Sequence, residues 1–113
     1  MASRWIRWFR ELSLSDVGLV GGKNASLGEL YRELTPVGVR VPNGFAVTAE
    51  AYRHFLRVHQ LEEVIQRELA GLDTRHLEEL AERGRRIREA ILSRPLPPEL
   101  AGEIVEAYRS LCQ

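Results

Sequence analysis

The chain has 113 residues, 44% of them hydrophobic and 28% charged, which is ordinary for one soluble globular domain or one lobe of a larger domain. Its 16 basic and 16 acidic residues cancel, which argues against nucleic acid or an anionic membrane as a partner, because both reward a basic excess. No apolar run approaches the ~20 residues of a membrane span, and arginines interrupt the start of the chain, so we expect neither a span nor a signal peptide. The single cysteine, Cys112, cannot form an internal disulfide, which favours a reducing, cytoplasmic setting.

The first third of the chain predicts a strand, a turn-rich connection and a helix. Aromatic and β-branched residues over 5–9 predict a short strand. Residues 13–22 are rich in turn-forming types, and Ser15 or Asp16 is suited to cap a short helical turn there. Residues 24–34 predict a helix. The apolar residues that we expect on its buried face are Leu27, Leu30, Tyr31 and Leu34.

A second strand is predicted over 45–47, after an alternating stretch at 39–41 and a turn at 42–44. Two short strands make a poor sheet by themselves. We therefore expect them to join a sheet that is completed by chain outside this sequence.

The second half predicts helices almost throughout, over 49–59, 61–70 and 75–93, with a last helix from Pro98. Thr48 is the expected N-cap of the helix at 49–59, and Asp73 or Thr74 that of the helix at 75–93. The residues expected on the inner faces of these two helices are Tyr52, Phe55, Leu56 and His59, and Leu77, Leu80, Ala81, Gly84, Ile87 and Ile91.

The residues with a chemical signature are Gly21, Gly22 and Lys23. Glycines allow a ligand to approach the backbone, and a helix that begins directly after them directs free amides and the positive end of its dipole toward the loop. This arrangement favours an anion, usually a phosphate. Lys23 adds a full positive charge, and it is the only lysine among the 16 basic residues.

The spacing fits neither of two familiar phosphate loops. The P-loop pattern requires a glycine where Val17 stands and a serine or threonine where Asn24 stands, and the dinucleotide-binding glycine pattern is absent. From the local chemistry alone, two interpretations stay open: a phosphate site, or an ordinary helix start with an exposed lysine.

Two blocks of sequence carry a resemblance to a known family. The first is Val20-Gly21-Gly22-Lys23-Asn24-Ala25-Ser26-Leu27-Gly28-Glu29-Leu30, and the second is Val41-Pro42-Asn43-Gly44-Phe45-Ala46-Val47-Thr48. In this order and spacing they resemble the start of the phosphoenolpyruvate synthase family (pyruvate, water dikinases), whose relatives are the pyruvate phosphate dikinases and rifampicin phosphotransferases. The resemblance covers nearly the whole chain, densely over 16–56 and diffusely over 61–112.

The resemblance implies an α+β, mostly helical fold: the N-terminal lobe of an ATP-grasp nucleotide-binding domain, with two or three short strands and four to five helices. Residues 1–113 would form a single partial domain. Lys23 matches the family's lysine that contacts ATP phosphates, and Gly21 and Gly22 would lie beside it. In the family, ATP phosphorylates a histidine on a mobile domain, which transfers the phosphoryl group to pyruvate and yields phosphoenolpyruvate, AMP and phosphate.

The resemblance also implies that much of the enzyme lies outside this sequence. The expected partners are ATP, the other ATP-grasp lobe, the phosphohistidine domain and the pyruvate-binding domain, and the Mg²⁺ ligands would lie outside these residues as well. We expect a truncated chain with no catalytic residue and no activity alone.

The remaining candidates are interpreted as structural. His54, His59 and His76 lack the sequence context of a phosphohistidine, Cys112 has no nearby base, and no Cys/His spacing predicts a zinc site. Two rivals stay open: another member of the same enzyme group, or a non-catalytic helical interaction module.

Overall fold

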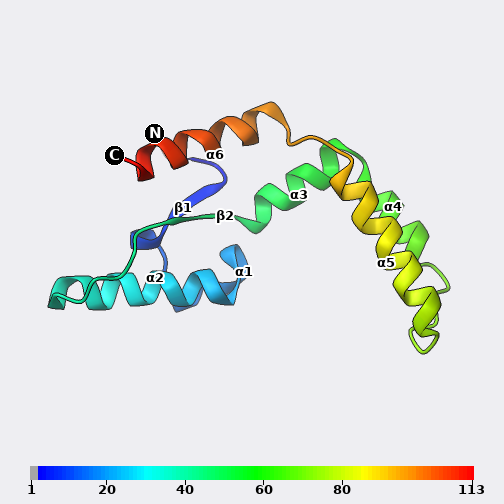
Figure 1. The fold of residues 1–113 in the computed structure, drawn as a ribbon, viewed down its shortest axis with the longest axis horizontal. Coiled ribbons are helices and arrows are strands. Elements are labelled where there is room, and N and C mark those ends of the chain that lie inside the picture. The colour runs from blue at the N-terminus through cyan, green and yellow to red at the C-terminus, as the bar shows by residue number, and fades with distance from the viewer. Residues whose placement is uncertain (1–2) are drawn as a thin grey trace. The chain divides into compact units, whose positions relative to one another are not determined.

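The computed structural model describes residues 3–113. Its strands and α-helices are β1 (Ile6–Trp8), α1 (Val17–Val20), α2 (Gly22–Leu34), β2 (Phe45–Val47), α3 (Ala49–Val58), α4 (Leu61–Leu69), α5 (Leu77–Leu92) and α6 (Pro98–Leu111) (Figure 1). Three 3-10 turns, η1 (Phe9–Glu11), η2 (Leu14–Asp16) and η3 (Thr35–Val37), complete the list. The mostly helical α+β class is confirmed. The described part has six helices where four or five were predicted, because the four-residue α1 was expected only as a turn.

The chain divides into two compact units. The first is built from residues up to 53 together with 98–113, and the second from 54–97. The first unit has two buried clusters and the second unit has one, among the described residues. Within residues 3–113, no helix has both the length and the apolar character needed to cross a membrane.

The first unit contains the two-stranded antiparallel sheet, in which Arg7 pairs with Ala46. Backbone bonds from Thr48 N to Trp5 O at 2.9 Å and from Phe9 N to Gly44 O at 3.0 Å extend this ladder. In an antiparallel pair, the backbone N–H and C=O groups of every second residue of β1 point away from β2. Side chains bond the outward backbone amides, since Ile6 N donates to Ser3 Oγ and Trp8 N to Glu11 Oε2, both at 3.0 Å.

One cluster of the first unit lies between α2 and β2. Leu12, Val20, Ala25 and Ala46 are buried together. The predicted inner face of α2 was wrong in part, because the buried residues of this helix are Ala25 and Gly28, whereas Leu30 is exposed. Small residues face the core because η1 and Leu12 cross the helix there at close range.

A second cluster of the first unit joins both ends of the chain. Trp5, Ala51 and Leu100 are buried together, and Ile104 of α6 packs against them. Figure 1 shows β1 and β2 running between α2 and α6. Thr48 caps α3 as predicted, since its hydroxyl accepts the Ala51 N–H at 3.4 Å.

The second unit is a helical hairpin of α4 and α5 with the end of α3. Leu61 at the start of α4 is buried with Phe55 and Leu56, and Ile91 near the end of α5 packs on them, so the two helices run antiparallel. The predicted burial of Tyr52 was wrong, because this side chain is exposed.

The predicted cap of the helix over 75–93, Asp73 or Thr74, was also wrong. The helix begins at Leu77, because the Asp73 carboxylate accepts the Arg75 N–H within a turn and so caps no helix. Leu77 and Leu80, expected on the inner stripe, are exposed, since the first turns of α5 extend past the part of α4 that could cover them.

Candidate functional site

The start of α2 is built around a glycine that no other residue replaces easily. Gly21 is the N-cap, with φ 84° and ψ 165°, a region that side chains with a Cβ avoid. Its N–H donates to Val17 O at 2.8 Å, and its carbonyl accepts the Ala25 N–H at 3.0 Å. The turn is therefore fixed by α1 before it and α2 after it.

The first amides of α2 have no capping side chain. Gly21 makes no side-chain cap bond, and helix geometry leaves the amides of Gly22, Lys23 and Asn24 without intrahelical acceptors. The Asn24 side chain donates to Val20 O at 3.0 Å, so it reinforces the turn and caps none of these amides. The positive end of the dipole of α2 lies at these amides and adds to their attraction for an anion.

Lys23 and Gly22 are exposed beside these amides. Among residues 3–113, Lys23 forms no ion pair with a carboxylate. A Cβ added to Gly22 would meet nothing within 4 Å. The chain's own packing therefore does not require glycine at position 22, and the space beside Lys23 is open to a ligand.

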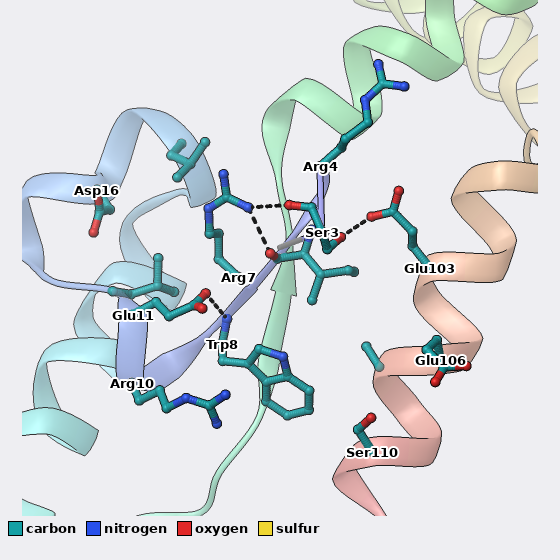
Figure 2. Close-up of a pocket in the computed structure, with 14 residues that line it drawn as sticks. Ser3, Arg4, Arg7, Trp8, Arg10, Glu11, Asp16, Glu103, Glu106 and Ser110 are labelled. Carbon is teal, nitrogen blue, oxygen red and sulfur yellow. Dashed lines mark hydrogen bonds between the residues drawn. The ribbon is translucent and has the colours of Figure 1, made fainter. Parts of the chain in front are cut away.

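A hollow of the first unit lies among other residues. A cavity of about 870 Å³ runs along β1 and the facing side of α6, and Arg7, Trp8, Leu12 and Glu103 are among its lining residues (Figure 2). Gly21, Gly22 and Lys23 do not line it. This hollow could not be predicted from local sequence patterns, because it depends on how residues near the two ends of the chain meet.

The acidic groups with a lowered pKa, Glu82 and Asp73, belong to the second unit. The Arg85 guanidinium, by hydrogen bonding, holds the pKa of Glu82 below its usual value, and Arg75 does the same to the pKa of Asp73. His59 Nε2 lies 2.7 Å from Pro95 O and packs edge-on to Phe55, which is a structural contact. Among residues 3–113, no three His, Cys, Asp or Glu side chains come together as a metal site.

The sequence over residues 17–113 matches the family described as pyruvate phosphate dikinase, AMP/ATP-binding domain. The chain belongs to this family. The matched region begins just before the Gly21–Lys23 turn and includes both sequence blocks on which the resemblance was based. The expected relationship is therefore confirmed, and it covers both compact units.

Several curated relatives match along nearly the whole chain. The phosphoenolpyruvate synthase of Neisseria meningitidis serogroup B is 50% identical over 111 residues, which is 98% of this chain and 14% of that protein. The phosphoenolpyruvate synthase of Synechocystis is 47% identical over 108 residues, which is 96% of this chain and 13% of that protein. That of Helicobacter pylori is 44% identical over 110 residues, which is 97% of this chain and 14% of that protein. The chain thus spans about one-seventh of the length of these relatives, within an ATP-binding portion of the family.

Proposed function

We propose that this chain is the first part of the ATP-grasp domain of a pyruvate, water dikinase, and that Lys23 contacts the ATP phosphates. Residues 1–113 would then belong to a single nucleotide-binding domain that needs further chain to enclose ATP. The complete enzyme would convert pyruvate, ATP and water to phosphoenolpyruvate, AMP and phosphate through a phosphohistidine. The family match and the names of the relatives support this activity.

The observation that carries the site is the exposed ammonium of Lys23, which pairs with no carboxylate among residues 3–113 and lies next to uncapped helix amides. Phosphoryl transfer depends mainly on positioning and charge stabilisation, for which these groups are suited. Lys23 would neutralise polyphosphate charge, the amides would donate to phosphate oxygens, and Gly22 would leave room for them. Removing one preorganised contact of this kind costs about 2–4 kcal/mol of transition-state stabilisation.

Magnesium enters this proposal only through the complete enzyme. Mg²⁺ binds through one or two carboxylates together with substrate phosphates, and we propose that other parts of the complete enzyme supply these carboxylates. The cytoplasm is the proposed compartment, in keeping with the single cysteine.

The test is an ATP titration of the chain followed by its amide resonances. The resonances of residues 18–26 should move first, with a dissociation constant in the millimolar range, about 4 kcal/mol of binding free energy. Gly22→Ala should leave the fold intact, because its Cβ meets nothing, yet it should weaken binding by filling the space beside the phosphates. Lys23→Ala should weaken binding as well.

Arg40→Gln is the matched control, because it removes one exposed positive charge of the same unit at a distance in sequence from the turn. It should leave the titration unchanged. Equal ATP binding by Lys23→Ala, Gly22→Ala and the unmodified chain would contradict the site. In the complete enzyme, the same Lys23→Ala change should lower the rate of AMP formation from ATP and pyruvate.

A further inference from the structure

The hollow along β1 is lined from both faces of the strand. Arg7 pairs directly with Ala46 across the sheet, so the two side chains share a face, and Ala46 is buried there with Leu12. Leu19 packs against this cluster and lines the hollow. Trp8 follows Arg7 in β1, so its side chain points to the opposite face. Figure 2 shows Trp8 directed toward α6 and Arg7 directed away from it.

Helix α6 lines the hollow on the side of Trp8. Its lining residues recur at helical spacing and form one stripe along the helix: Glu103, Glu106, Ala107 and Ser110. The hollow therefore lies at the outer edge of β1, between α6 on one side and the segment around Leu19 on the other. Strand β2 contributes no residue to it.

The position of the hollow at a strand edge selects an extended occupant. One compact ligand cannot contact side chains of β1 that point in opposite directions. An extended backbone can place side chains on both sides of the sheet, because successive residues of a strand point to alternate faces. Helix α6 and the segment around Leu19 would cover these two faces, as the packed layers of a domain require. The hollow thus has the place of one further strand of the sheet.

The outer edge of β1 is bonded by side chains and by no strand. Ile6 N donates to Ser3 Oγ at 3.0 Å, and Ile6 O accepts from Arg7 Nη1 at 2.9 Å. Trp8 N donates to Glu11 Oε2 at 3.0 Å. Among residues 3–113, the sheet contains only β1 and β2, so no further strand pairs with this edge. The three bonding side chains are at least partly exposed, so they can turn away and leave the backbone groups to an added strand.

The course of α6 sets the direction of the added strand. Glu103 accepts a hydrogen bond from Ser3, just before β1, and Figure 2 shows Ser110 at the other end of the strand, on the side of Trp8. Helix α6 and β1 therefore run in the same direction. A segment that follows α6 begins beside the end of β1 and runs back along it, which is antiparallel to β1.

We propose that this hollow receives the first extended segment after residue 113 of the complete enzyme, as a third strand antiparallel to β1. Strand β1 then becomes the central strand, between β2 and the added strand. The relatives support an occupant from the same polypeptide, since the chain spans about one-seventh of their length. The inference rests on the proposed continuation of the chain, but not on contact between Lys23 and ATP.

Amide hydrogen exchange at single residues tests this pairing. It is measured in the isolated chain of 113 residues and in the complete enzyme, by mass spectrometry with electron-transfer fragmentation. In the complete enzyme the amides of Ile6 and Trp8 should exchange at least about tenfold more slowly, because main-chain bonds within a covered sheet open less often than bonds to exposed side chains. The amides of Phe45 and Val47, which point outward from β2, should gain no such protection.

A side chain that fills the hollow should prevent this protection. Ser110 is exposed in the last turn of α6, so Ser110→Trp should leave the circular dichroism of the isolated chain unchanged. In the complete enzyme it should return the exchange rates of Ile6 and Trp8 toward those of the isolated chain. Arg109→Trp should leave the protection in place, because Arg109 is exposed at the neighbouring position of α6 and does not line the hollow. Protection that survives Ser110→Trp would place the strand outside the hollow and overturn the proposal.

Three further outcomes would overturn it. Equal exchange of Ile6 and Trp8 in the isolated chain and in the complete enzyme would show that no strand pairs with β1. Protection gained at Phe45 and Val47 instead would assign the added strand to β2. Slower exchange of Ile6 and Trp8 at higher concentrations of the isolated chain would assign the hollow to a second copy. The ATP titration reads residues 18–26, so the nucleotide site and this pairing can fail independently.

Discussion

Gly28 lies in the middle of α2, where Leu12 and the backbone of η1 cross the helix. A Cβ built at this position would lie 2.4 Å from Leu12 Cβ and 3.1 Å from Phe9 O. A glycine-to-alanine change inside a helix normally stabilises it by about 0.5–1 kcal/mol. Here the crowding outweighs this gain, since overpacking of this kind costs about 1–3 kcal/mol. Gly28→Ala should therefore lower the free energy of unfolding, measured by urea denaturation.

Gly102 in α6 is the matched control for this prediction. It lies inside a helix as well, but its added Cβ meets nothing within 4 Å. Gly102→Ala should stabilise the chain by about 0.5–1 kcal/mol, the ordinary difference in helix propensity. Similar effects of both changes would show that helix propensity, and not contact with Leu12, decides the outcome at Gly28.

Single residues of the first unit show what sequence periodicity cannot predict. Helical spacing identified the large apolar residues of α2, yet the helix buries Ala25 and Gly28, because close approach requires small side chains. The exposed position of Lys23 fits both interpretations of the glycine-rich turn, a phosphate site and an ordinary helix start, so its contact with phosphate stays a prediction. Arg7 carried no signal at all, because its two acceptors and the hollow exist only in the folded chain.

Among the elements, the α4–α5 hairpin carries a network of ion pairs that depends on pH. Arg85 bonds Glu82 and Glu89, and Arg83 joins Glu79 of its own helix to Glu68 of α4. The hydrogen bond from Arg85 holds the pKa of Glu82 below its ordinary value of 4.5. A carboxylate with a lowered pKa in the folded state stabilises the fold above the ordinary value, and this contribution is lost as pH falls through the lowered one.

The hairpin should therefore lose stability as the pH falls below about 4.5, the ordinary Glu82 value. Asp73, whose pKa is also lowered, by Arg75, acts in the same direction from 3.8 downward. The effect is modest, because these groups are exposed and solvent screens their pairs. Thermal unfolding followed by circular dichroism at pH 6 and pH 3 measures it. Glu82→Gln should reduce the difference between the two midpoints, and an unchanged difference would exclude Glu82 as a cause.

Most elements could be predicted from the sequence, and their boundaries followed local chemistry. The strand over 5–9 is present as β1, and the helix over 61–70 as α4, because aromatic and amphipathic patterns are strong there. The start of α5 was misplaced because the Asp73 carboxylate has two possible uses, a helix cap or a turn, and only the folded chain decides between them. The packing of the start of the chain against α6 could not be predicted, because local patterns do not indicate which distant segments meet.

For the molecule as a whole, the division into two units predicts two responses to core substitutions. The sequence has two tryptophans, Trp5 and Trp8, and both lie in the first unit, so tryptophan fluorescence reports on that unit alone. Leu100 of α6 is buried against Trp5. Leu100→Ala should destabilise the first unit by about 2–5 kcal/mol, the usual range for a buried leucine.

The second unit should respond separately, because Leu61 is buried there with Phe55 and Leu56 and with no group of the first cluster. Leu100→Ala should shift the fluorescence transition to lower urea and leave amide exchange in α4 and α5 nearly unchanged. Leu61→Ala should do the reverse, speeding exchange in α4 and α5 with little effect on fluorescence. Helix α3 runs from one unit into the other, so it is the element through which the two could be coupled. If both probes shift together in both variants, α3 makes the chain a single cooperative unit.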